Sequence, residues 1–135
     1  MIYIFSAFYA EAKNIIDHYG LKKEKSPEMV RFDVFANESI RLVITGVGEI
    51  NAAAAVSNIG GAYGISPDDE ILNVGCGAGF SSDICLGSIF LGNKLTEQMT
   101  GRTFYPDMLM KANFRECDIL TAIRVLKERR EQFAY

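Results

Sequence analysis

Short apolar runs that alternate with helix-forming segments are the feature that most restricts the fold of this chain. Residues 1–5 form a continuous apolar run. Ala12, Ile15 and Ile16 follow it at helical spacing. A second, mostly apolar segment at 40–45 leads through two glycines into an alanine-rich, helix-forming segment. Apolar strands that alternate with helices are typical of sheets covered by helices on both faces. The pattern therefore predicts an α/β sandwich.

The same patterns place the elements along the chain. Gly20 and Gly64 each follow a helix-forming segment and predict where those helices end. We expect strands at 1–5, 30–34, 40–45, 70–74, 88–92 and 118–123, and helices that end at Gly20, span 51–63 and span 125–133. Turns are expected at 22–27, 37–39 and 67–69. Residues 93–106 have little periodicity, which predicts a loop that faces a ligand or a partner chain.

Composition narrows the class of protein. The chain has 135 residues, 49% hydrophobic and 23% charged, which is ordinary for one soluble globular domain spanning 1–135. A net charge of −3 disfavours a nucleic-acid partner. No apolar run approaches the roughly 20 residues of a membrane span, and the first residues do not resemble a signal peptide. Three cysteines without a close pair and a single histidine predict no disulfide framework and no metal site, and they suit the reducing cytoplasm.

A glycine-rich segment follows residues 70–74, which we expect to be a short buried strand in the centre of the sheet. Gly75, Gly77 and Gly79 leave the backbone open, and ligands of α/β folds bind at the carboxyl ends of strands. Glycines that follow a strand form a simple tight turn about as often as they form a ligand site. Residues 71–79 also look like the first motif of S-adenosylmethionine-dependent methyltransferases, so a methyltransferase-like domain is one alternative.

Three features weigh against a methyltransferase. Its fold needs a crossover of about ten residues or more before the next strand, and only residues 80–87 are available. The next strand ends at 92–94 (GNK), without the acid that holds ribose hydroxyls. Asn73 stands where that motif usually has an acid.

Two further segments carry candidate ligand-binding side chains. Glu11 follows the first strand, where a carboxylate can hold and deprotonate a water molecule. The alternative is a solvated glutamate that the helix dipole favours. Arg102 could bind an anion or a ribose oxygen, and Phe104 and Tyr105 could stack on a base. The alternative for these aromatic residues is packing or an interface.

Three segments together resemble the nucleoside phosphorylase and nucleosidase superfamily, especially the methylthioadenosine/S-adenosylhomocysteine nucleosidases. They are 4–11 (IFSAFYAE), 43–54 (VITGVGEINAAA) and 72–79 (LNVGCGAG), the last followed by 86–90 (LGSIF). The resemblance extends to about Asp107. It implies a three-layer α/β/α sandwich with a central mixed sheet. It also implies cleavage of a purine nucleoside to free base and ribose or ribose phosphate.

The resemblance also implies roles for individual residues. Glu11 matches the glutamate that holds the attacking water, and Phe8 matches the apolar residue beneath the ribose. Cys76 replaces a serine near the nucleophile, and Gly77 and Ala78 match backbone positions along the base. No cofactor is implied, although phosphate is a possible co-substrate in a glycosyltransferase of this superfamily. The absence of an evident arginine cluster for phosphate favours hydrolysis. A homodimer or larger homo-oligomer is expected.

The chain departs from the family in its last third. The family's general acid, an aspartate, and its Met-Glu ribose clamp have no match here, and the chain ends at Tyr135. We therefore expect a protein that resembles the first part of a family member and is a poor catalyst alone. The alternative is a non-catalytic remnant that keeps the fold and its contacts between copies.

Overall fold

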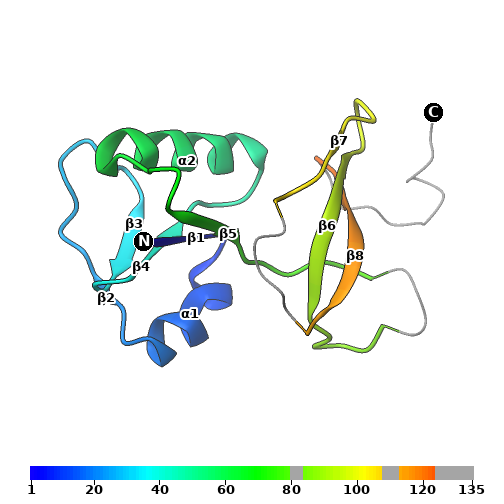
Figure 1. Cartoon of the computed structure of the whole chain (residues 1–135), viewed down its shortest axis with the longest axis horizontal. Helices are drawn as coiled ribbons and strands as arrows, with labels where there is room; N and C mark the ends of the chain where they lie inside the picture. Colours follow the sequence, from blue (N-terminus) through cyan, green and yellow to red (C-terminus); the bar gives the residue numbers. More distant parts are fainter. Residues whose placement is uncertain (80–83, 108–112, 124–135) are drawn as a thin grey trace. The chain divides into compact units, whose positions relative to one another are not determined.

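The computed structural model describes residues 1–79, 84–107 and 113–123. The chain divides into two compact units, Met1–Gly77 and Ala78–Tyr135 (Figure 1). The single-domain organisation expected from the chain length stays a prediction.

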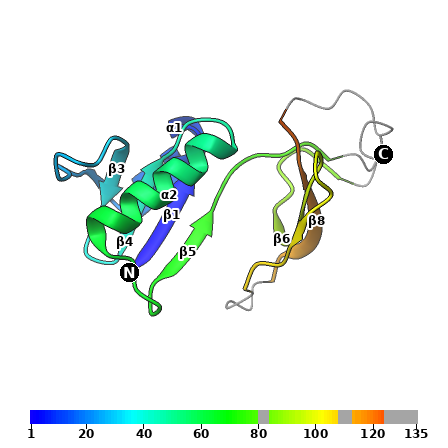
Figure 2. The ribbon, with the colours of Figure 1, turned by 90° about the horizontal axis from the view of Figure 1, so that it is seen from above.

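A five-stranded mixed sheet is the centre of the first unit. Its order is β2-β3-β4-β1-β5, with β1 parallel to both of its neighbours and β2, β3 and β4 antiparallel. The strands are β1 (Ile2–Ser6), β2 (Lys22–Lys23), β3 (Asp33–Ala36), β4 (Ile40–Ile44) and β5 (Glu70–Asn73). Helix α1 (Tyr9–His18) packs on one face and helix α2 (Glu49–Tyr63) on the other (Figure 2). The three-layer α/β/α arrangement with a mixed sheet is thereby confirmed.

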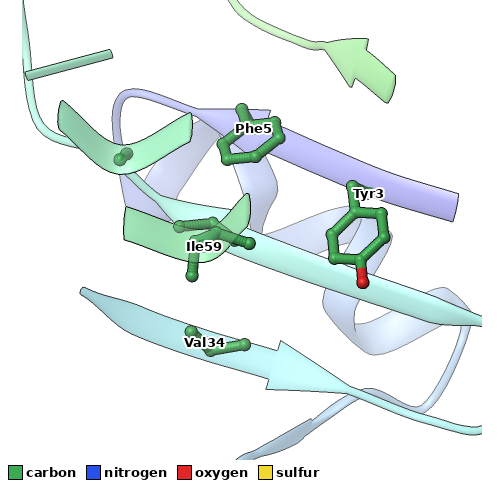
Figure 3. Close-up of a cluster of buried hydrophobic side chains, with 6 residues drawn as sticks. Tyr3, Phe5, Val34 and Ile59 are labelled. Atoms are coloured by element: carbon green, nitrogen blue, oxygen red, sulfur yellow. The ribbon is translucent and has the colours of Figure 1, made fainter. Parts of the chain in front are cut away.

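The core is split between the two faces because side chains alternate along a strand. Tyr3 and Phe5 of β1 pack with Val34 and Ile59 under α2 (Figure 3). Ile4, between them in sequence, points to the opposite face and joins the cluster that α1 covers. β1 is therefore buried on both faces, which explains its continuous apolar run.

Both predicted helix ends in this unit are confirmed. Gly20 has φ 60°, and Gly64, which caps α2, has φ 68°, so both are left-handed positions that favour glycine. The turn at 37–39 is also present, since the Asn37 side chain accepts hydrogen bonds from the backbone amides of Ser39 and Ile40.

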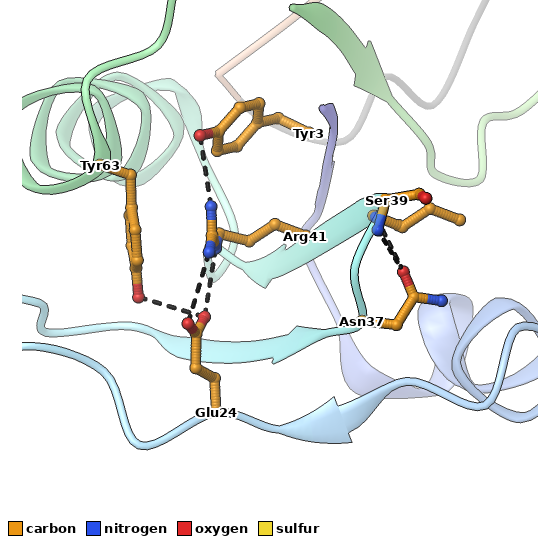
Figure 4. A network of polar contacts seen from close by, with 7 residues as sticks. Tyr3, Glu24, Asn37, Ser39, Arg41 and Tyr63 are labelled. Atoms are coloured by element: carbon orange, nitrogen blue, oxygen red, sulfur yellow. Dashed lines mark hydrogen bonds and ion pairs between the residues drawn. The ribbon is translucent and has the colours of Figure 1, made fainter.

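A polar network ties the segment after β2 to the sheet and to α2 (Figure 4). The Arg41 guanidinium is 3.1 Å from the Glu24 carboxylate and lies 3.8 Å from the centre of the Tyr63 ring. The Tyr63 hydroxyl donates to Glu24, and Arg41 donates to the Tyr3 hydroxyl. Burial lowers the pKa of Arg41, but hydrogen bonding to Glu24 and its negative charge outweigh burial, so the net pKa is raised.

The strand expected at 30–34 begins three residues later, at Asp33. Two further expectations for the first unit are wrong. Residues 22–27 were expected to be a turn, but Lys22–Lys23 forms a short strand that pairs with Phe35 and Ala36. The strand after Asp69 was expected to be central, yet β5 is the outermost strand of this sheet among the described residues. β5 is also only partly buried, with Ile71 52% exposed, because strand order and burial depend on pairing with distant segments.

The second unit holds a three-stranded sheet of order β7-β6-β8. Its strands are β6 (Phe90–Glu97), β7 (Thr103–Phe104) and β8 (Arg115–Thr121), with β6 parallel to β8 and antiparallel to β7. The prediction of a loop at 93–106 is wrong, because the first of these residues continue β6 and others form β7. Both strands are partly or fully exposed, so no strict apolar alternation marks them. The helix expected at 125–133 lies outside the described residues.

Between β5 and β6, the described residues 74–79 and 84–89 contain no helix. Within the described ranges, no helix is long and apolar enough to cross a membrane.

The core under α2 generates a stability prediction. Ile59 is fully buried, whereas Ile71, on the edge strand β5 of the same sheet, is 52% exposed. Ile59→Ala should lower the free energy of unfolding by about 2–5 kcal/mol, since it removes packed methylenes and leaves a cavity. Ile71→Ala is the control and should lower it by less than about 1 kcal/mol. Urea titration followed by circular dichroism measures both, and equal effects would show that α2 does not pack as described.

Candidate functional site

The site begins where β1 ends. The chain leaves β1 at Ser6 and enters α1 at Tyr9, so Glu11 falls in the first turn of that helix. A carboxylate is favoured there by the partial positive charge of the helix N-terminus. No side chain caps α1, since Phe8 stands at the N-cap position. Glu11 is half-buried beside the carboxyl end of β1.

Both oxygens of the Glu11 carboxylate have a hydrogen-bond donor. The backbone amide of Cys76 donates to Oε1 at 3.1 Å, and the Ser6 hydroxyl lies 3.4 Å from Oε2. These donors come from segments that are far apart in sequence. The carboxylate is thus oriented by the ends of two adjacent parallel strands.

Backbone hydrogen bonds bring three strand ends together around this carboxylate. The amide of Val74, just after β5, donates to the Phe5 carbonyl at 2.9 Å. On the other side of β1, the amide of Thr45 donates to the Ser6 carbonyl at 2.9 Å. The carboxyl ends of β1, β4 and β5 therefore meet, as ligand sites of α/β folds require.

Gly75 leaves space beside the carboxylate. A methyl group in place of its hydrogen would lie 3.8 Å from Oε2 and 3.9 Å from Oε1 of Glu11. That is ordinary van der Waals contact with both oxygens, so a side chain here would cover them without a clash. The φ angle of Gly75 is not positive, so its backbone does not require glycine.

Two exposed apolar side chains stand at the same end of the sheet. Phe8 lies between β1 and α1 and is 53% exposed. Val47, which the sequence analysis did not single out, lies between β4 and α2 and is also exposed. Exposed apolar groups at the end of the sheet that also carries a half-buried carboxylate suit a ligand with both a polar and an apolar face.

The remaining predicted site residues are distributed over both units. Gly77 ends the first unit and Ala78 begins the second, both exposed. Phe104 lies in β7, with Arg102 just before it and Tyr105 just after, and all three side chains are exposed. Their expected roles as ligand-binding residues stay predictions.

Sequence reasoning missed two features of the site. It named Cys76 for its side chain, whereas the contact with Glu11 is made by the Cys76 backbone amide. It also overlooked Ser6, whose only signal is a polar residue at the end of an apolar strand. Across the described residues, no three or more His, Cys, Asp or Glu side chains gather as a possible metal site.

No family model and no curated protein sequence matches this chain. Solved structures do. The 5′-methylthioadenosine/S-adenosylhomocysteine nucleosidase of Neisseria meningitidis, in complex with methylthio-immucillin-A, matches with a TM-score of 0.76 and 15% identity over 97% of this chain and 68% of its own. The S-adenosylhomocysteine nucleosidase of Streptococcus pyogenes, in complex with 5-methylthiotubericidin, has a TM-score of 0.77 and 15% identity, covering 97% of this chain and 66% of its own.

A mutant futalosine hydrolase of Helicobacter pylori matches with a TM-score of 0.75 and 11% identity, over 97% of this chain and 71% of its own. The chain therefore has a nucleosidase-like fold and spans about two thirds of the length of these proteins. The resemblance in fold expected from the sequence is confirmed.

The glycines of the site generate a second stability prediction. Gly75→Ala should leave the free energy of unfolding unchanged or raise it by up to about 1 kcal/mol, because it restricts the unfolded chain without straining the folded one. Gly46→Ala is the contrasting variant, since Gly46 has φ 80° and its added methyl would lie 3.3 Å from the Asn51 side chain. Gly46→Ala should lower the free energy of unfolding by about 1–3 kcal/mol. Urea titration of both variants measures the difference, and a costly Gly75→Ala would contradict the described backbone.

Proposed function

We propose that this chain binds a purine nucleoside over the carboxyl ends of β1, β4 and β5 and carries the water-activating side of a nucleosidase site. The observation that carries the proposal is the Glu11 carboxylate, oriented by Ser6 and by the Cys76 amide beside the side-chain-free Gly75. The nucleosidase-like fold supports it.

The proposed reaction is hydrolysis of the N-glycosidic bond. Glu11 accepts a proton from a water molecule while the water oxygen forms a bond to C1′ of the ribose. The bond from C1′ to the base nitrogen breaks, and its electron pair leaves with the base. The ribose becomes cation-like as this bond breaks, so the fixed negative charge of Glu11 favours the transition state.

The other candidate residues receive roles in the same proposal. Phe8 supplies an apolar floor beneath the ribose, and the backbone at Gly77 and Ala78 lines the base. The roles expected for Arg102, Phe104 and Tyr105 of the second unit, an anion contact and aromatic stacking, stay predictions. No cofactor or metal takes part, and water is preferred to phosphate as the nucleophile. We place this purine nucleoside metabolism in the cytoplasm.

The chemistry is incomplete on the leaving-group side. By resemblance, the general acid that protonates the base and the clamp that holds the ribose hydroxyls have no matched residue in this chain. Each such group typically contributes on the order of 10²–10⁴ in rate. Nucleoside binding and slow hydrolysis are therefore expected, rather than turnover at the roughly 1–10³ per second of ordinary enzymes.

Glu11→Gln tests the proposal. Adenine release from 5′-methylthioadenosine, followed by chromatography at high protein concentration, should be faster than in buffer but slower than about 1 per second. Glu11→Gln removes the base, so the rate should fall by about 10²–10⁴-fold or to the buffer rate.

Glu49→Gln is the matched control, because Glu49 occupies the first turn of the other helix. Both variants lose a charge that the helix dipole favours. If Glu11 acts only through the dipole, the two variants will have the same rate and the proposal fails. A wild-type rate equal to buffer favours a non-catalytic domain. Binding of S-adenosylmethionine in place of nucleosides would favour the methyltransferase-like alternative.

We also propose that copies of the chain associate through α2. The residues of α2 that face away from the sheet include the exposed Ile50, Ala53 and Ala54. Glu49 is the one charged residue of the helix. The outer face of a surface helix is normally charged or polar, so this apolar face favours contact with another copy.

Sedimentation velocity tests the association. The wild-type chain should be a dimer or larger at micromolar concentration. Ala54→Glu should shift it toward the monomer, because a charge buried in an interface loses its hydration. Lys13→Glu changes an exposed residue of α1 and should leave the sedimentation coefficient unchanged. A wild-type monomer would contradict the proposal.

A further inference from the structure

Ser6 occupies a position where the strand pattern calls for an apolar side chain. Alternation along β1 places Ile2, Ile4 and Ser6 in one row, and Ile4 and Ile2 belong to the apolar cluster under α1. Ser6 continues this row and is 0% exposed. A buried hydroxyl is costly unless it is hydrogen-bonded, so its partner indicates why a serine stands here.

The partner of the Ser6 hydroxyl is Glu11. The distance from Oγ to Oε2 is 3.4 Å, and among the described residues Glu11 is the hydrogen-bond partner recorded for this side chain. The backbone carbonyl of Ser6 is engaged separately by the amide of Thr45.

We propose that Ser6 is a positioning residue that holds Glu11 in the orientation needed to bind the attacking water. Ser6 donates to Oε2 from the end of β1, while the Cys76 amide donates to Oε1 from the segment after β5. With one donor on each oxygen the carboxylate cannot rotate freely, and each oxygen keeps a second lone pair for water. The inference rests on the proposed role of Glu11 as the base.

The long contact fits this role. Hydrogen bonds around a catalytic group are often long before the substrate binds and shorten in the complex. Because misplacement by about 1 Å can cost 10²-fold in rate, loss of the Ser6 hydroxyl should lower kcat by about 10–10²-fold. KM should change little, since Ser6 acts on the carboxylate and not on the nucleoside.

The test is a double-mutant cycle on adenine release from 5′-methylthioadenosine with the full chain. Ser6→Ala should lower kcat, and in the Glu11→Gln background it should have no further effect, because its role passes through Glu11. Thr45→Val is the matched control. It removes a buried hydroxyl at the end of the neighbouring strand, whose partners are the backbone carbonyls of Gly46 and Ser6. Its kcat should stay at the wild-type value.

Each outcome decides between the two proposals. The inference is overturned if Ser6→Ala keeps the wild-type kcat or if Thr45→Val loses as much as Ser6→Ala. It is also overturned if Ser6→Ala lowers kcat as much in the Glu11→Gln background as in the wild type. Each of these outcomes leaves the role of Glu11 intact. No effect of Glu11→Gln, or no wild-type rate above buffer, would overturn the proposed function itself. Thermal unfolding checks that each variant folds. If Ser6→Ala does not fold, Ser6→Cys replaces it in the test. Cysteine has a similar shape and a weaker donor, so this variant should give an intermediate kcat.

Discussion

Strand β1 is hydrogen-bonded in parallel to β4 on one side and to β5 on the other, and helices cover both of its faces. The register aligns Phe5 with Val43 and with Asn73. Because the three strands run in the same direction, their carboxyl ends meet at one end of the sheet. Any shift in this register would separate Glu11 from the segment that follows β5.

The candidate site depends on this alignment of strand ends. Glu11 comes from the helix after β1, Ser6 from the end of β1 itself, and the Cys76 amide from the segment after β5. None of these groups is unusual alone, and a glutamate in the first turn of a helix is favoured by the dipole in any case. The donors on both oxygens distinguish Glu11 from Glu49, which also lies in the first turn of a helix but has no side-chain hydrogen bond recorded in the described structure.

Local patterns predicted most of the first unit. The apolar run of β1, the turn at Asn37 and the helix stops at Gly20 and Gly64 depend on neighbours in sequence, and all are present. Patterns failed where pairing with distant segments decides the structure. Lys22–Lys23 is a strand because β3 pairs with it, and β6 extends to Glu97 although its residues are all half-buried and do not alternate.

For the site, the sequence by itself determined the residue types and their places in chain order: a glutamate after the first strand, glycines after the strand at Glu70, and a serine at the end of an apolar run. Only the tertiary structure decided that the Cys76 backbone amide, not its thiol, contacts Glu11, that Ser6 faces the carboxylate, and that Gly75 leaves space beside it. The physical reason is that these groups are far apart in the chain, with Glu11 and Cys76 separated by 65 positions. The parallel register of β1 with β5 brings them within hydrogen-bonding distance, and no local pattern encodes that register.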